Sequence, residues 1–341
     1  MKNLAIAFLL VGVLFGSFSL QAVELRNGHP DVYIVKKGDT LWDISAVFLD
    51  KPWLWPEIWH VNPQVENPHL IYPGDELRLV YMDGKPRIVR SNDLKLSPQI
   101  RVLSEGDAVP TIPLDNIRPF LYTPRILTDE EIDSAPYILA ADSQRLIFGQ
   151  GHKVYFRGVK DDDRVAYSLF RKGDPYVDPI TQEVLGIEAI HLGSGKKVRG
   201  GDPATMMINE SVQEIMAGDR ALPYEDQLFP PVFMLRAPDI DINAYIISVY
   251  NGVTQIGTYD VVILNKGQRD GLEVGHVMTV MQSGRKVDDE YAMDDDNKNV
   301  TLPAESAGEL LVFRVFEKTS LALIMNATRP IHTMDTAVTP R

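Results

Sequence analysis

The sequence predicts an α+β protein, in which a small βααβ domain precedes a mainly antiparallel β region built from two related units. Two observations lead to this fold class. Within residues 31–82 the apolar pattern changes from strand to helix, to a second helix and back to strand. From residue 137 onward, short segments of alternating apolar and polar residues recur in two runs that align without gaps.

The first 22 residues, MKNLAIAFLLVGVLFGSFSLQA, have the layout of a secretory signal peptide. Lys2 precedes an apolar run that is short for a membrane-spanning helix, and a small and polar stretch follows up to Ala22. An uncleaved anchor is the alternative, because Leu20 makes the cleavage site imperfect. We therefore expect a protein that is exported to the periplasm.

The composition and net charge of the chain limit the kinds of molecule that it is expected to bind. The 341-residue chain is long enough for two or three domains, and its net charge of -13 argues against sequence-independent binding of nucleic acid or anionic lipid. It contains no cysteine, so neither disulfides nor lipoprotein attachment are expected. Neutral or basic partners fit this charge, and burial alone has to hold the fold together.

The predicted βααβ domain begins with a strand over VYIV, residues 32–35, and a turn over KKGD. Asp39 or Thr40 can cap the following helix, and Asp43 stands three residues after Thr40. The apolar face of this helix comprises Leu41, Ile44, Val47 and Phe48. A second helix fits residues 56–60, with Pro56 in its first turn, and ELRLV at residues 76–80 fits the closing strand.

All four tryptophans of the chain, Trp42, Trp53, Trp55 and Trp59, fall in this domain. A small domain without disulfides or metal needs large apolar side chains, which indole rings supply. We expect Trp42 and Trp59 to be core residues. Trp53 and Trp55 flank a proline-bounded loop, so one of them is a candidate for stacking on a sugar ring or on a partner protein.

The segments YIVKKGDTLWDIS, VNP and NPHLIYPGDELRL together resemble a LysM domain, the module that binds peptidoglycan and chitin. The resemblance covers residues 31–82 and implies a βααβ fold with a shallow glycan groove. It implies N-acetylglucosamine contacts from Gly38, Asp39, Thr40 and Leu41 on one wall and from His69, Leu70, Ile71 and Tyr72 on the other. Purely structural roles are the alternative, with Asp39 and Thr40 as caps and Gly38 and Gly74 as turn residues.

Residues 83–136 are rich in proline and charge, which predicts a linker that passes into an extended segment, with one helical turn at TDEEI. The first β unit is expected over residues 137–230 and the second over residues 231–341. YILAADSQRLIFGQGHKVYF from Tyr137 aligns on YIISVYNGVTQIGTYDVVIL from Tyr245, which places Gly149 on Gly257. Chance similarity of two β segments is the alternative to duplication.

The second unit carries an acidic loop at residues 288–299, where a calcium site and a solvated loop are both open. VVILNKGQRDGLEVGHVMTV resembles the C-terminal domain of the flagellar assembly protein T family, and the whole arrangement is similar to LysM proteins associated with the type IV pilus secretin. This resemblance implies partner contacts at Lys266, Arg269, Asp270 and Glu273, for which ordinary turn roles are the alternative.

Catalytic motifs are absent from the sequence. There is no thiol nucleophile, the seven histidines form neither H-x-H nor H-E-x-x-H, no G-x-S-x-G occurs, and GSGKK at residues 193–197 reads as a hairpin tip. A glycosidase with two distant carboxylates stays open. We expect a non-enzymatic adaptor, without cofactor or metal, that anchors a pilus secretin to peptidoglycan. A flagellar-ring scaffold, a free-standing wall-binding protein and, less favoured, a wall hydrolase are the alternatives.

Overall fold

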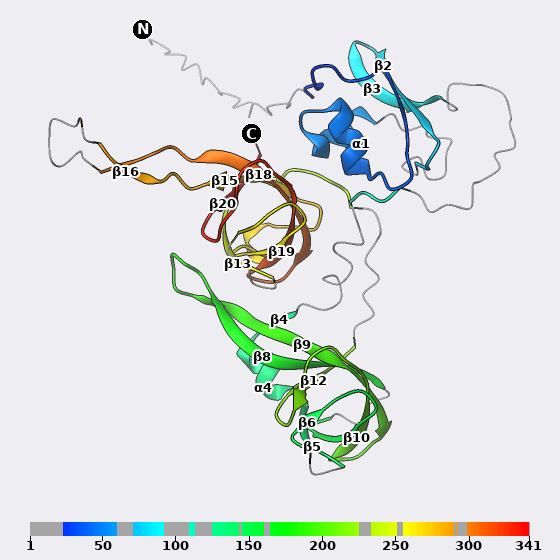
Figure 1. The fold of residues 1–341 in the computed structure, drawn as a ribbon, viewed down its shortest axis with the longest axis vertical. Helices are drawn as coiled ribbons and strands as arrows, with labels where there is room; N and C mark the ends of the chain where they lie inside the picture. Colours follow the sequence, from blue (N-terminus) through cyan, green and yellow to red (C-terminus); the bar gives the residue numbers. More distant parts are fainter. Residues whose placement is uncertain are drawn as a thin grey trace, which may run out of the picture.

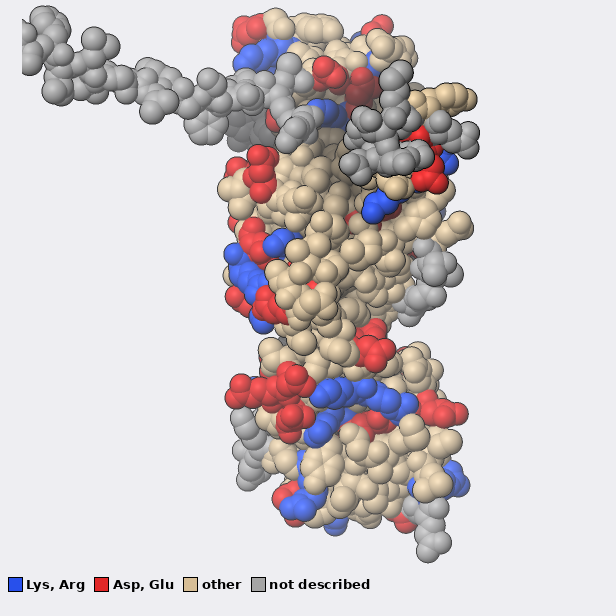
Figure 2. Space-filling model, turned by 90° about the vertical axis from the view of Figure 1, so that its left-hand side faces the viewer, with Lys and Arg blue, Asp and Glu red and all other residues tan. Residues whose placement is uncertain are grey.

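The structure is a computed structural model that describes residues 23–59, 71–91, 109–112, 125–142, 145–159, 164–224, 233–250, 255–289, 291 and 299–340. Three units make up the molecule (Figure 1), and their order in space differs from their order in the chain. The C-terminal barrel, yellow to red, lies between the N-terminal unit in blue and cyan and the other β unit in green. Figure 2 shows the same stack from the side, with uncharged side chains over much of its middle.

The N-terminal unit has the predicted βααβ order. It comprises β1 (Val32–Ile34), α1 (Leu41–Phe48), a 3-10 helix η1 (Pro52–Leu54), α2 (Trp55–Ile58) and β2 (Glu76–Met82), with β1 antiparallel to β2. Thr40 caps α1, because its hydroxyl accepts from Asp43 N at 3.1 Å while the Asp43 carboxylate accepts from Thr40 N at 3.1 Å. No helix among the described residues is long and apolar enough to cross a membrane.

A third strand, β3 (Lys85–Arg90), extends this sheet in the order β1-β2-β3 and lies within the predicted linker and extended segment. Asp83 and Gly84 both have positive φ angles, 53° and 75°, as a two-residue hairpin turn requires. Pro86 does not prevent pairing, because β3 lies at the edge of the sheet.

The first β unit starts before the predicted boundary at residue 137. Its early elements are β4 (Arg125–Leu127), which pairs with β9, and the predicted helical turn, α4 (Asp129–Ser134). The remaining strands are β5 (Tyr137–Ala141), β6 (Ile147–Phe148), β7 (Lys153–Arg157), β8 (Ala166–Val177), β9 (Val184–Arg199), β10 (Ala204–Ser211), β11 (Ile215–Met216) and β12 (Arg220–Pro223). The main sheet runs β10-β7-β5-β12-β8-β9-β4, and an additional β10–β9 pairing closes six of these strands into a ring, with β4 outside it.

The GSGKK segment lies inside β9, so the prediction of a hairpin tip there is wrong. Its glycines permit close approach of neighbouring strands. A Cβ atom on Gly193 would lie 2.1 Å from the carbonyl oxygen of Glu210, and one on Gly195 would lie 2.4 Å from the sulfur of Met206.

The C-terminal unit is a closed barrel with the order β13-β14-β19-β18-β15-β20. Its strands are β13 (Asn243–Val249), β14 (Val261–Leu264), β15 (Val277–Gln282), β18 (Glu305–Val315), β19 (Ser320–Ala327) and β20 (Thr336–Val338). The short η3 (Gln268–Asp270) precedes β15, and the hairpin of β16 (Lys286–Asp288) and β17 (Asn299–Thr301) projects from the barrel (Figure 1). The chain after the N-terminal unit is therefore mainly antiparallel β, as predicted.

The strands of the two β units pair in the same order. In the first β unit, a ring of paired strands is formed by β5, β7, β8, β9, β10 and β12, which we number one to six in chain order. The six barrel strands are numbered in the same way. Around each ring, neighbouring strands then follow the order 1-2-5-4-3-6. The turn before each second strand also matches: Gly149 O accepts from His152 N at 3.1 Å, and Gly257 O accepts from Asp260 N at 3.3 Å.

Candidate functional site

The first wall of the predicted glycan groove is the loop between β1 and α1. Gly38 has a φ of +96°, which favours glycine, and the Asp39 carboxylate closes the loop by accepting from Lys36 N at 2.8 Å and from Tyr33 Oη at 2.9 Å. Burial of Tyr33 and its bond to Asp39 raise the pKa of Tyr33 to about 12. Asp39 thus holds the shape of the loop, and Thr40, with 3 % exposure, caps α1.

The second wall is the chain that enters β2. Ile71 is fully buried, and Tyr72 N donates to the Asp75 carboxylate at 3.0 Å, which makes a tight turn with Gly74 at a φ of +93°. Arg90 of β3 lies 3.7 Å from the same carboxylate. Predicted site residues His69 and Leu70 lie outside the described residues.

A short segment from the predicted linker, residues 109–112, lies between these two walls. Leu41 N donates to the Pro110 carbonyl at 2.9 Å, and Trp42 N donates to the Thr111 carbonyl at 3.1 Å. On the other side, Val109 N donates to the Ile71 carbonyl at 2.7 Å. The structure therefore brings Leu41 and Ile71 to opposite sides of one backbone segment, which sequence reasoning missed because such a contact has no periodic signature.

All four indole rings are buried. Trp42 and Trp59 are 5 % and 4 % exposed, which confirms them as core residues, but Trp53 and Trp55 are only 3 % and 5 % exposed. Trp42 stacks on Trp53 with ring centroids 6.5 Å apart, and Trp55 stacks on Trp59 at 4.6 Å. The expectation that Trp53 or Trp55 presents its ring to a sugar or a partner is therefore corrected: each pairs with another indole inside the protein.

These tryptophans belong to a buried apolar cluster that also includes the outer face of the barrel. We call that face the barrel outer face; it comprises Val261, Ile263, Val277, Leu311, Phe313, Leu321, Leu323 and Met325, all 3 % exposed or less. β14 and β19 consequently bury both faces, one inside the barrel and one against the N-terminal unit. A polar group lies here too, since burial raises the pKa of Glu309 in β18 to about 7, and nearby Lys51 acts against this shift.

The four predicted partner contacts lie around η3 and make bonds within the chain. Lys266 Nζ lies 3.1 Å from the Asp270 carboxylate, which also accepts from Gly267 N at 3.1 Å. Glu273 pairs with Arg236 and is the most exposed of the four, with 64 % of its side chain accessible. Whether these residues also contact another protein stays a prediction.

Arg269 joins the two β units. Its guanidinium donates to both carboxylate oxygens of Glu183, at 2.9 and 2.8 Å, and Glu183 immediately precedes β9 in the connection between β8 and β9. Lys318 reaches the same carboxylate at 2.7 Å, and these two cations lower the pKa of Glu183 to about 2. Beside them, Asn265 Nδ2 donates to the buried Asp178 at 2.8 Å. This part of the predicted partner surface thus contacts the hairpin of the same chain.

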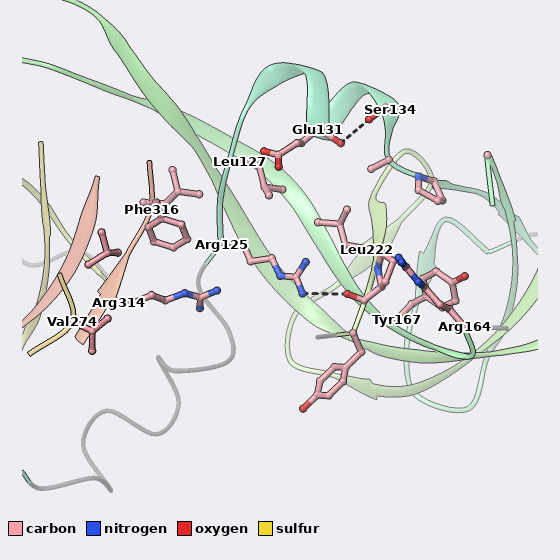
Figure 3. Close-up of a pocket in the computed structure, with 17 residues that line it drawn as sticks. Arg125, Leu127, Glu131, Ser134, Arg164, Tyr167, Leu222, Val274, Arg314 and Phe316 are labelled. Atoms are coloured by element: carbon pink, nitrogen blue, oxygen red, sulfur yellow. Dashed lines mark hydrogen bonds between the residues drawn. The ribbon is translucent and has the colours of Figure 1, made fainter. Parts of the chain in front are cut away.

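An open cavity of about 1050 Å³ lies between the two β units (Figure 3). Figure 3 shows Arg314 on the barrel side of this cavity and Arg125 on the strand of the first β unit. Arg125 donates to the Pro223 carbonyl at 3.1 Å, and Arg314 lies over the ring of Phe316, 5.0 Å from its centroid. The described lining includes three arginines, Arg125, Arg164 and Arg314, and one carboxylate, Glu131.

Metal ligands do not converge in the part of the chain that the structure describes, where no group of three or more His, Asp or Glu side chains could hold an ion. Most of the predicted acidic loop, residue 290 and residues 292–298, lies outside that part, so the choice between a calcium site and a solvated loop stays open.

Comparison with known proteins identifies residues 33–80 as a LysM domain. Over 60 residues the chain is 38% identical to an uncharacterized protein, YqbP, of Bacillus subtilis strain 168. That match covers 15% of this chain and only 27% of the Bacillus protein. LysM domains bind peptidoglycan and other glycans that contain N-acetylglucosamine, and they are binding rather than catalytic domains. The domain assignment therefore supports glycan binding at the N-terminal unit.

Proposed function

We propose that this protein is a non-enzymatic periplasmic adaptor that holds peptidoglycan through its LysM domain and presents its β region to an envelope machine. The observation that carries the proposal is the LysM domain at residues 33–80. It is supported by Leu41 and Ile71, which hydrogen-bond to residues 109–112 from opposite sides. The machine that we favour is the outer-membrane secretin of the type IV pilus.

The groove suits the acetamide of N-acetylglucosamine, which has one hydrogen-bond acceptor and one donor. The Leu41 and Trp42 amides in the first turn of α1 already bind carbonyl oxygens, so they can bind an acetamide oxygen. The Ile71 carbonyl already accepts an N–H, as it would from the acetamide nitrogen. Backbone groups therefore provide the recognition, and Tyr72, half-buried at the rim, is the side chain best placed to pack on the sugar.

Co-sedimentation with purified sacculi tests whether the protein binds peptidoglycan through its LysM domain. The mature protein should pellet with sacculi, Tyr72→Ala should pellet several-fold less, and the matched Tyr72→Phe variant should keep most of the binding because it keeps the ring. Equal pelleting of all three variants would place the wall contact elsewhere. Release of soluble muropeptides by the pure protein would contradict the non-enzymatic assignment.

The proposed contact with a secretin rests on two resemblances. The segment around Lys266 and Glu273 resembles the flagellar assembly protein T family, and the arrangement of the whole chain resembles LysM proteins associated with the pilus secretin. Crosslinking followed by purification from cells should recover secretin subunits. Recovery of flagellar ring proteins would favour the second candidate, a flagellar scaffold, and recovery of neither would favour a free-standing wall-binding protein.

The periplasmic location rests on residues 1–22, which lie outside the described residues. N-terminal sequencing of the protein purified from the envelope should find Val23 as the first residue. An intact Met1 on membrane-bound protein would instead indicate an uncleaved anchor.

We also propose that the two β units are copies of one ancestral unit. Their common strand order supports this, and so do matching bonds before the sixth strand. Ile138 N donates to the Asp219 carbonyl at 2.8 Å, and Ile246 N donates to the Asp335 carbonyl at 2.9 Å. Ile138 and Ile246 occupy the same place in the ungapped sequence alignment.

A further inference from the structure

Residues 109–112 lie between the two walls of the expected LysM groove and hydrogen-bond to both of them. Val109 is 5 % exposed, Thr111 2 % and Ile112 0 %, so the segment is as buried as the core around it. Its backbone bonds to both walls, through the Leu41 and Trp42 amides on one side and the Ile71 carbonyl on the other. A tetrapeptide flanked by residues of an expected linker thus fills the place where the sugar is expected.

Residues 109–112 hydrogen-bond to the same backbone groups of the LysM domain that the acetamide of N-acetylglucosamine would use. Pro110 and Thr111 supply carbonyl oxygens, and Val109 supplies an N–H, which are also the acceptor and donor types of N-acetylglucosamine. The Leu41 amide, at 2.9 Å from the Pro110 oxygen, cannot hold a sugar oxygen in the same geometry at the same time. Segment and glycan therefore exclude one another.

We propose that the LysM groove is a binding site for a short polypeptide segment, filled in cis by residues 109–112, which a glycan has to displace. The binding of a polypeptide segment in the groove is inferred from the hydrogen bonds just described. Its displacement by a glycan rests on the function proposed above. The apparent affinity for glycan is then lowered by the fraction of molecules in which the segment occupies the groove.

The same segment also links the groove to the barrel. Thr111 Oγ1 accepts from Phe233 N at 3.1 Å, and Phe233 belongs to the apolar cluster that includes the barrel outer face. Displacement of the segment breaks this bond and exposes Ile112. Glycan binding should therefore weaken the contact between the LysM domain and the barrel.

Matched substitutions at Val109 in the full mature protein test the proposal. Val109→Pro lacks the N–H that bonds to Ile71, whereas Val109→Ala keeps it. Isothermal titration with a soluble N-acetylglucosamine oligomer should show about three- to tenfold tighter binding by the proline variant than by the alanine variant, which is the typical worth of one hydrogen bond. Ile112→Asp, which buries a charge when the segment is in place, should bind the oligomer more tightly still.

Amide hydrogen exchange on the parent protein supplies a readout that does not depend on any variant folding. The oligomer should raise the exchange rate at Val109 while the Leu41 amide stays protected. Equal affinities across the variants, with Val109 protected when sugar is bound, would overturn the displacement and leave glycan binding intact. Failure of every folded variant to bind the oligomer would overturn the displacement and the glycan function together.

Discussion

At the scale of single residues, the capping box of Thr40 and Asp43 decides where α1 begins. Its two reciprocal bonds leave the next amides, those of Leu41 and Trp42, directed at the groove. Thr40→Ala should lower the free energy of unfolding by about 1 kcal/mol, the usual cost of a lost N-cap, whereas Thr40→Ser should lie close to the parent. Urea denaturation followed by circular dichroism measures this, and an unchanged midpoint for the alanine variant would show that the cap is dispensable.

Glu309 makes stability depend on pH. Burial raises its pKa from 4.5 to about 7, so the folded state binds more protons than the unfolded state between these values. Its contribution is therefore most favourable below pH 4.5 and is lost as the pH rises through 7. Glu309→Gln should flatten this slope and raise the free energy of unfolding at pH 8 by about 1 to 3 kcal/mol. Denaturation at several pH values checks this, and parallel curves for parent and variant would contradict it.

Several residue roles could be predicted from sequence because they depend on local chemistry. Thr40 as the cap and Trp42 and Trp59 as core residues follow from spacing and side-chain size. The burial of Trp53 and Trp55 could not be predicted, because it depends on how these rings pack in space, where Trp53 stacks on Trp42 and Trp55 stacks on Trp59.

At the scale of elements, strand composition explains which β unit the LysM domain covers. In the ungapped alignment, Val261 and Ile263 of β14 correspond to Lys153 and Tyr155 of β7. Val261 is 2 % exposed on the barrel outer face, whereas Lys153 is exposed to solvent. Only the second unit therefore has an apolar outer surface along this strand that favours docking.

Leu323 of β19 tests this interface. It is fully buried on the barrel outer face, so Leu323→Ala should lower the free energy of unfolding by about 2 to 5 kcal/mol. Leu146→Ala is the matched control, since Leu146 is 85 % exposed and its truncation should change stability by less than about 0.5 kcal/mol. Thermal and urea unfolding of the two variants measure the difference, and equal stabilities would show that the outer face is not packed in solution.

Two local sequence patterns, a turn dipeptide and a pair of uninterrupted apolar runs, indicate further features of the fold. Asp83-Gly84 between apolar runs is a strong hairpin signal, and it predicts β3 where a linker was expected. The uninterrupted apolar runs VVIL in β14 and SLALIM in β19 indicate strands buried on both faces, which predicts a covering element for the barrel.

At the scale of the whole molecule, the chain order hides the arrangement in space. The fold of each unit follows from local patterns, but the position of the barrel between the other two units does not. Its contacts, such as Arg269 with Glu183 and Phe233 with Thr111, join residues 86 and 122 positions apart. No spacing rule relates such residues, so neither the packing of residues 109–112 against the LysM domain nor the stacking of the three units could be predicted from the sequence.

The concentration of all four indoles in one cluster has a practical consequence. Residues 125–224 contain tyrosines but no tryptophan, so tryptophan fluorescence carries no signal from within the first β unit. Every indole is instead buried in the cluster that joins the LysM domain to the barrel. The protein thus has a native optical probe of domain separation, which can be followed in real time on unlabelled material while sacculi or partner proteins are added.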